Sequence, residues 1–595
     1  MKKWLPLLLV LVLLCGCGNT PTEETTPSTG ANQPLVEYPE VQNPVYEEIP
    51  YVSRFDTETV ITLSGDTVAV QGNEAGVYTS RDIVYYEDRD TYDSGNPYGE
   101  GTTADKHSRE EADAHLVVNI TEPGAYRVTG QLSLGQIRID LGADAYYDET
   151  AVVELILDNA DITCTVAPAV LFVNVYECDG NWSEATATAQ VDTAAAGANV
   201  ILEGVNHVDG AYVAKIYKDK DGAKKQWKQD GALYSYMSMN VFGPGTLELT
   251  AANEGLDSEL HLTINGGNIN IRAQNDGINT NEDNVSVTTI NAGTVHIIAG
   301  LGAEGDGIDS NGYLVINGGV VVSSANPAAD AGLDSDLGSF VNGGIVVALG
   351  STMDWAESDS EQVTMNLQFA QMQASSASIV VAYPDGTVAF AYDPGRDEVL
   401  GENVRQYRGA VISCPNFHVG QGYYVYLGGQ IDGTETGGIY DVSTVTGFAG
   451  GTRMQYTGTD VGMGFGGGWG GQMPGGMPGG DVPQGDFQLP EDFTMPEGDF
   501  QIPEQPSMPE NMPSGWGGQM PEGFDGSQVP GGMPGGNMPN GGQMPGGMPG
   551  DLPEGFDPGA MGSGWGQASQ ESGEANVLFL MVDPVNAFSG VGPAE

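Results

Sequence analysis

Positively charged side chains are scarce in this chain, whose 595 residues contain 20 Lys and Arg against 80 Asp and Glu, for a formal net charge of −60. No lysine follows Lys228. Such a chain cannot release counterions from a phosphate backbone, which excludes a nucleic-acid binder that works by neutralising phosphates. For the same reason it has no direct attraction to an anionic membrane surface.

Cysteine and histidine are also few. The five cysteines form no C-x-x-C motif and the six histidines are scattered, which argues against a zinc site. Cys164 and Cys178 either pair in an oxidising compartment or remain as buried thiols, and the sequence leaves both possibilities open.

Long apolar runs are confined to the N-terminus. Lys2 and Lys3 precede an apolar run over residues 5–14, which is too short to cross a membrane and is typical of a secretion signal. The run ends in Leu-Cys-Gly-Cys, which resembles a bacterial lipobox and implies cleavage before Cys17 and a lipid on its thiol. We therefore expect a signal peptide over residues 1–17 and a protein held on the extracytoplasmic face of the cell membrane by lipid alone.

Composition divides the remaining chain into five parts. Residues 18–50 are rich in Thr, Pro and Glu and predict a flexible stalk. Short β-branched runs closed by Gly, Asn or Asp fill 51–350, and alternating strands over 351–460 predict a small antiparallel C-terminal module. Gly, Pro and Met dominate 461–574, which predicts a long disordered insertion; we expect residues 575–595 to return to the module as a terminal strand.

An internal repeat lies within the strand-rich part. Its copies have the form apolar-Asn-Gly/Ala-Gly with a β-branched residue two places after the last Gly, and their asparagines are spaced 26, 26 and 25 residues apart: Asn265, Asn291, Asn317 and Asn342. A period near 25 with short strands and no helix fits coils of a parallel β-helix, in which each coil stacks on the next. A β-sandwich with four similar hairpins is the alternative.

Stacked coils place equivalent residues in columns. We expect two inward columns of β-branched residues: Ile264, Ile290, Ile316 and Val341 in the first, and Ile269, Val295, Val321 and Val346 in the second. The sharp turn between the columns uses glycine and asparagine, and stacked asparagines can hydrogen-bond along the column.

A second motif, acid-Gly-apolar-Asp/Asn-Ser/Thr, precedes each copy and begins at Glu254, Asp276 and Asp306, with Ala331 in the fourth. Stacking aligns these acids along one edge, where they repel one another unless protonated or bridged by a hard cation such as Ca²⁺. The alternative is a row of solvated Asp-Gly turns. The predicted Ca²⁺ ligands are Asp257, Asp276, Asn279, Asp306, Asp309, Asp334 and Asp336.

The two repeated motifs, with the segment 155–163 upstream, resemble the bacterial family of carbohydrate-binding domain-containing proteins. The resemblance extends over about 51–460 and the final strand. It implies a right-handed parallel β-helix like that of polysaccharide lyases, with calcium sites and binding to plant-type polysaccharides, including acidic pectic chains. The polar segment near 86–114, expected to be an inserted loop, and the Gly/Pro/Met-rich tract depart from the family pattern.

Cleavage of the polysaccharide is not expected. Eliminating a uronic acid needs a Lys or Arg base beside the calcium, and the repeats supply only Arg272, which should point outward. The predicted function is therefore calcium-supported polysaccharide binding by a monomer at the cell surface. A calcium-dependent lyase and a structural or adhesive envelope protein are the rivals. A basic, aromatic surface for an anionic sugar chain is predicted at Lys224, Lys225, Trp227 and Lys228.

The lipid anchor can be tested by Cys17→Ala. Removing the thiol removes the acceptor of the lipid, so the variant should leave the membrane fraction and appear in the soluble fraction. Fractionation followed by immunoblotting measures this, and a variant that stays with the membranes as the unmodified chain does would contradict the anchor.

Overall fold

The structure is a computed structural model, and it describes residues 38–42, 48–86, 104–180, 183–214, 228–351, 355–374, 376–399, 405–461 and 576–594. The signal peptide, Cys17 and nearly all of the predicted Gly/Pro/Met-rich insertion lie outside these residues. Within the described part, no helix combines the length and the apolar character that crossing a membrane requires.

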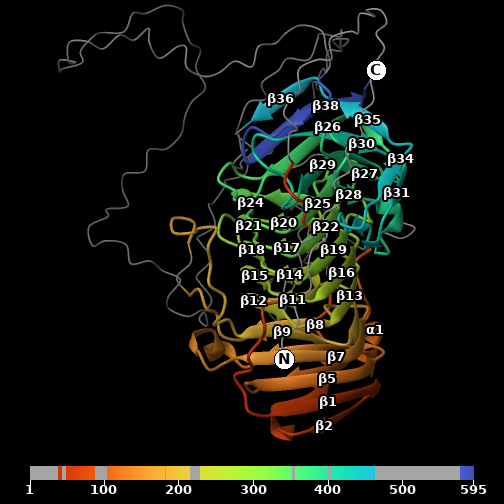
Figure 1. Cartoon of the computed structure of the whole chain (residues 1–595). Coiled ribbons are helices and arrows are strands. Elements are labelled where there is room, and N and C mark those ends of the chain that lie inside the picture. Colours follow the sequence, from red (N-terminus) through yellow and green to blue (C-terminus); the bar gives the residue numbers. More distant parts are fainter. Residues whose placement is uncertain are drawn as a thin grey trace, which may run out of the picture. The chain divides into compact units, whose positions relative to one another are not determined.

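Three parallel sheets make up most of the described chain, and the chain passes through them in turn (Figure 1). In one coil, β14 (Glu254–Ser258) is followed by β15 (His261–Ile264) and β16 (Asn268–Ala273). Each of these strands pairs in parallel with the strand three places later, because the next coil lies directly on the previous one.

We number the sheets by their place in the coil. Sheet 1 contains β1 (Glu58–Gly65), β5 (Gly124–Leu132), β7 (Val153–Cys164), β9 (Ala198–Glu203), β12 (Met239–Phe242), β15, β18 (Val287–Ile290), β21 (Tyr313–Ile316) and β24 (Gly338–Val341). Sheet 2 continues from the second half of β7 through β10 (Val205–Gly210), β13 (Thr246–Ala251), β16, β19 (Thr294–Ile298), β22 (Val320–Ser324) and β25 (Ile345–Gly350). Sheet 3 contains β4 (Leu116–Ile120), β6 (Gly135–Asp140), β8 (Val170–Asn174), β11 (Gly231–Ser235), β14, β17 (Ile278–Thr280), β20 (Ile308–Ser310) and β23 (Leu333–Ser335).

The predicted inward columns are confirmed. Ile264, Ile290, Ile316 and Val341 lie opposite one another in sheet 1 and are at most 1% exposed. The column that begins at Ile269 is fully buried in sheet 2. The chain is thus nearly all β, with large parallel sheets, and the parallel register excludes a sandwich of hairpins; the right-handed winding stays a prediction.

The turn between sheets 1 and 2 contains a ladder of asparagine side chains. Nδ2 of Asn291, Asn317 and Asn342 donates to Oδ1 of the asparagine one coil earlier at 2.8–2.9 Å. The glycine two residues after each asparagine has a positive φ, from +80° at Gly319 to +96° at Gly267. Glycine therefore provides the whole left-handed turn, since none of the four asparagines has a positive φ, which corrects the expectation that asparagine shares this conformation.

An antiparallel module follows the last coil. Its strand β29 (Tyr407–Ser413) pairs with β25 and with β26 (Thr364–Gln373), and β38 (Val585–Pro593) pairs in parallel with β26. The chain thus returns to the module at its C-terminus. The module's other strands are β27 (Ile379–Ala382), β28 (Val388–Tyr392), β30 (Gly422–Leu427), β31 (Gln430–Asp432), β32 (Glu435–Thr436), β33 (Ile439–Tyr440), β34 (Gly447–Ala449), β35 (Thr452–Gln455), β36 (Gly458–Val461) and β37 (Phe579–Leu580).

The first coils carry short additional elements. β2 (Thr67–Gln71) pairs antiparallel with β1, and β3 (Val77–Ser80) pairs antiparallel with β4. The predicted loop near 86–114 contains a helix, α1 (Arg109–Ala114), because Ser108 and Glu111 form a capping box at its start. Single turns of 3₁₀ helix cover η1 (Glu74–Gly76), η2 (Ala143–Tyr147) and η3 (Pro394–Arg396).

Two local expectations change in the folded chain. Part of the predicted stalk is packed: the Tyr38 ring lies 5.1 Å from that of Tyr383, and the Ile49 amide donates to the Asn265 carbonyl at 2.9 Å. Cys164 and Cys178, whose pairing the sequence left open, are both free thiols.

The stacked core can be tested by Ile290→Ala. Truncating this fully buried side chain removes apolar contacts from the coils on either side, and we expect a loss of about 3 kcal/mol in the free energy of unfolding. Thr289→Ala is the control because Thr289 is the adjacent, outward-facing residue. Urea denaturation measures both, and equal losses for the two variants would contradict the assigned inward column.

Candidate functional site

Sheet 3 brings the acidic motif of each coil into register along its outward face. Asp257 lies opposite Asn279, Asn279 opposite Asp309, and Asp309 opposite Asp334. Adjacent strands in a sheet are about 4.8 Å apart. Four of the predicted calcium ligands therefore form one column, which we call the acidic column.

Burial decreases along the acidic column. Asp257 is completely buried and Asn279 is 6% exposed, whereas Asp309 and Asp334 are partly buried. Asp336, the remaining predicted ligand in this coil, is exposed. The column thus has one end within the protein and one end that solvent and a ligand can reach.

Three oxygens at the buried end have no hydrogen-bond donor among the described residues. They are Glu254 Oε2, Asp257 Oδ2 and Asn279 Oδ1. The other oxygen of Asp257 accepts from Asn281 Nδ2 at 2.8 Å. Buried polar atoms normally have partners, so unpartnered oxygens of this kind call for a proton or a cation.

The pKa values of these buried carboxyl groups also reflect the lack of hydrogen-bond donors around them. Burial, and then the charge of Asp257, raises the pKa of Glu254 well above its usual range. Burial, and to a lesser extent the charge of Asp230, also raises the pKa of Asp257 well above its usual range. The carboxyl groups of Glu254 and Asp257 are close enough to share a proton. The hydrogen bond between them exists only while one of the two groups is protonated.

A second column of acids, at the first motif position and three residues before the acidic column, has a partly structural role that the sequence analysis did not predict. Asp276 Oδ1 accepts the backbone N–H of Asp306 at 2.7 Å, and Asp306 Oδ1 accepts the N–H of Ala331. Each carboxylate thus caps an amide of the following coil. Burial raises the pKa of Asp276 well above its usual range and that of Asp306 to about 7.

A lysine also lies beside the buried acids. Lys228 Nζ is 2.6 Å from Asp230 Oδ2, and its charge also acts on Glu254 and Asp257. Burial lowers the pKa of the Lys228 ammonium, but the charges of Asp230 and Glu254 outweigh this effect and the pKa is raised. Lys228 was predicted as part of a basic surface for sugar; the structure places it against the acids, and the other members of that surface, Lys224, Lys225 and Trp227, lie outside the described residues.

The oxygen atoms of the acidic column match the donor chemistry of a hard divalent cation. Among the described residues, however, no group of three His, Cys, Asp or Glu side chains is arranged to hold a metal ion. A cation at the buried end therefore needs Asn279 and oxygens other than carboxylates besides Glu254 and Asp257. Glu254 was missed as a candidate ligand although it occupies the same motif position as Asp276 and Asp306.

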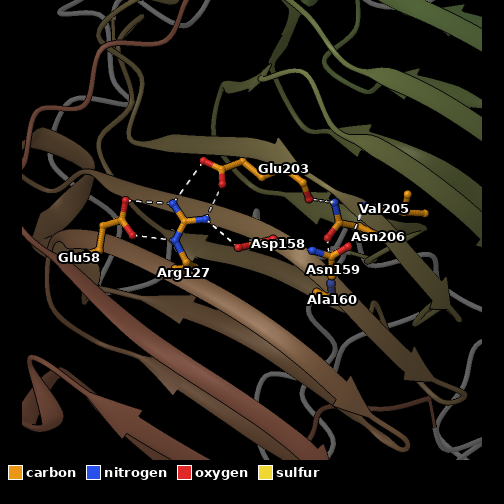
Figure 2. Close-up of polar contacts among 8 residues, drawn as sticks. All are labelled: Glu58, Arg127, Asp158, Asn159, Ala160, Glu203, Val205 and Asn206. Atoms are coloured by element: carbon orange, nitrogen blue, oxygen red, sulfur yellow. Dashed lines mark hydrogen bonds and ion pairs between the residues drawn. The ribbon is translucent and has the colours of Figure 1, made fainter.

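A separate charge cluster lies on the outward face of sheet 1 in the first coils (Figure 2). Arg127 donates to Glu58 at 2.7 Å, to Asp158 at 3.0 Å and to both carboxylate oxygens of Glu203. The hydrogen bond from Arg127 lowers the pKa of Glu58. Here one guanidinium neutralises acids from three other strands of sheet 1.

Asparagine side chains extend this cluster toward sheet 2 (Figure 2). Asn206 Oδ1 accepts the Ala160 N–H at 2.9 Å, and Asn159 Oδ1 accepts the Val205 N–H at 3.3 Å. Asn159 is one of two non-glycine residues with positive φ in the described chain. These bonds satisfy backbone groups where the strands change direction, so this cluster stabilises the coils.

Comparison with known proteins supports the resemblance seen in the repeats. Residues 114–390 match the family described as carbohydrate-binding domain-containing protein, which confirms that resemblance for the segment containing the acidic column. A solved structure, that of the polysaccharide lyase-like protein from C. thermocellum in a gadolinium derivative, is 20% identical over 48% of this chain and 93% of its own, with a TM-score of 0.29. That TM-score is too low to support a structural argument. No curated protein matches the chain.

The buried acids predict a pH dependence of stability in the presence of a chelator. Their pKa values are raised in the folded protein, so the folded form binds more protons than the unfolded form between pH about 4 and about 7. The free energy of unfolding should therefore fall as pH rises through this window, by at most about 1.4 kcal/mol for each unit of pKa shift.

Urea denaturation in EDTA at several pH values measures this dependence. Asp306→Asn should reduce the slope because it removes a titrating carboxyl group whose pKa is raised to about 7. Asp66→Asn, at an exposed turn, is the control. Stability that stays constant or rises over this window would contradict the assignment of protonated acids at the buried end.

Proposed function

We propose that this protein binds polysaccharide at the cell surface without cleaving it, on a right-handed parallel β-helix that Ca²⁺ supports. The family match over residues 114–390 supports carbohydrate as the ligand class. The three parallel sheets and their regular coils support the β-helix. A lipid on Cys17 would hold the protein on the outer face of the membrane.

The calcium part of the proposal depends on one observation, the unpartnered buried oxygens of Glu254, Asp257 and Asn279. A cation there would be held by these oxygens together with carbonyl or water oxygens, as Ca²⁺ prefers. It would supply positive charge that replaces the shared proton and lets stacked carboxylates stay ionised at neutral pH.

A second cation, at the exposed end of the column, would have a different task. Asp309 and Asp334 are partly buried and face each other across neighbouring coils. Asp309 and Asp334 would hold the ion on a side that solvent reaches, where a sugar carboxylate, an oxygen ligand of the same kind, could also bind it. This bridge explains how so acidic a chain attracts an acidic polysaccharide.

Two contacts argue against a lyase. Lys228 lies beside the buried acids in the described part of the chain, but its raised pKa keeps it protonated, and a protonated amine cannot remove the α-proton of a uronic acid. Arg272, the base candidate within the repeats, lies on β16, and its Nη1 is 3.4 Å from Glu248 Oε2. We therefore retain binding without cleavage, with a calcium-dependent lyase as the alternative.

Calorimetry with polygalacturonate, together with thermal melting of the same samples, tests this function. Ca²⁺ should raise the melting temperature, since an ion at 100 times its Kd adds about 2.7 kcal/mol to the native state. Polygalacturonate should bind in Ca²⁺ and not in EDTA. Asp309→Ala should reduce both effects, whereas Asp66→Ala, which removes an exposed carboxylate far from the column in sequence, should change neither.

The outcomes separate the alternatives. Unsaturated products released from polygalacturonate would establish the lyase. Melting curves that coincide in Ca²⁺ and EDTA would show that the acidic column is a row of protonated or solvated acids without a cation. Binding that is equally strong in EDTA would remove the calcium bridge while leaving carbohydrate binding in place.

A further inference from the structure

A groove on the outward face of sheet 1 is chemically different from the acidic column. It has a volume of about 630 Å³, and its floor consists of outward residues of β12, β15, β18 and β21 with the asparagine ladder along one side. Residues 189–194 and Ile49 form its walls. We call this hollow the amide groove; its size is within the range of ordinary ligand sites.

The asparagine ladder gives the groove a repeating pattern of donors and acceptors. An amide nitrogen has two N–H groups and an amide oxygen has two lone pairs. In Asn291 and Asn317 the ladder uses one N–H and one lone pair, so each side chain retains one donor and one acceptor. Asn291, Asn317 and Asn342 also keep solvent-exposed surface.

The opposite wall is held in place before any ligand arrives. The Thr193 hydroxyl lies 2.7 Å from both Asn240 Oδ1 and Thr263 Oγ1, and Asn240 Nδ2 donates to the Thr193 carbonyl at 2.8 Å. From the other side, the Arg54 guanidinium donates to the carbonyls of Ala194 and Ala195. A fixed wall reduces the ordering cost of binding.

Charge is nearly absent from the groove. Of the described residues that line it, Asp192 alone carries a charge, and no Lys, Arg or His is among them. Asp192 Oδ1 is turned to the backbone N–H of Ala194 at 2.9 Å. An anionic sugar would gain no ion pair here, whereas uncharged hydroxyls, which both donate and accept, match the free groups of the asparagines.

The spacing favours a polymer over a single sugar. The four asparagines of the ladder extend over four coils, a length of about 14 Å at the strand spacing of a sheet. Ile49, which is 43% exposed, supplies apolar surface for the C–H face of a sugar ring. Repeating amides along a straight groove suit a chain whose hydroxyls also repeat.

We propose that the amide groove binds an uncharged segment of a polysaccharide chain, and that it does so without a cation. This inference rests on the proposed carbohydrate-binding function and adds a second binding surface of different specificity. The acidic column takes uronic acids through Ca²⁺, and the amide groove takes neutral sugars through hydrogen bonds.

Calorimetry of the full chain in EDTA with cellohexaose, xylohexaose and mannohexaose tests the proposal, with polygalacturonate in Ca²⁺ measured in parallel. At least one neutral hexaose should bind. Thr289→Tyr places a large side chain on the groove floor and should weaken this binding by about tenfold or more. Thr294→Tyr is the matched control, since Thr294 is a partly buried residue on β19 in sheet 2.

Asn317→Leu is a second variant, with the same branching and the same number of heavy atoms, that removes an exposed amide from the ladder, and melting curves check that each variant is folded. We expect weaker neutral-sugar binding in both groove variants and unchanged polygalacturonate binding. Failure of the unmodified chain to bind any neutral hexaose, or wild-type binding by both folded groove variants, would overturn the amide groove while leaving the acidic column standing. Loss of polygalacturonate binding in the unmodified chain as well would remove the proposed function itself.

Discussion

Register between stacked coils is the constraint on which the rest of the structure depends. Each residue lies opposite its equivalent in the next coil, at about 4.8 Å, because the strands of successive coils pair in parallel. A side chain that tolerates its own kind as a neighbour is therefore favoured at every position. The β-branched columns and the asparagine ladder meet this condition, since the former pack and the latter hydrogen-bond.

Carboxylates do not meet this condition without help, and the protein supports them in three different ways. In the first coils, Arg127 lies between acids of neighbouring strands and neutralises them. In the second acid column, Asp276 and Asp306 each accept a backbone amide of the next coil. At the buried end of the acidic column, Glu254 and Asp257 are left to share a proton or to accept a cation.

The register between stacked coils also gives the stacked sheets two surfaces of different chemistry. Sheet 3 repeats carboxylates and becomes a column that needs positive charge, while the edge of sheet 1 repeats amides and needs none. Under the two proposals above, a polysaccharide with both uronic acid and neutral residues would offer a partner for each surface. Repetition along the coils would suit a repeating ligand of this kind, because contacts of one kind recur at each step.

Much of the repeating architecture could be predicted from sequence, because the period alone sets which residues face each other. The spacing of 26, 26 and 25 residues predicted the inward columns, the asparagine ladder and the alignment of Asp257, Asn279, Asp309 and Asp334. Alternation within each strand then decided which side chains face the core.

Contacts made by segments outside the repeat were decided by the tertiary structure. Lys228 lies against Asp230 and the buried acids, and residues 189–194 form a wall of the amide groove, although neither segment carries a repeat. Asp257 is buried and Asp336 is exposed, and this difference also depends on which segments cover each coil. These contacts join segments that are distant in the chain, and no local pattern of residues specifies them.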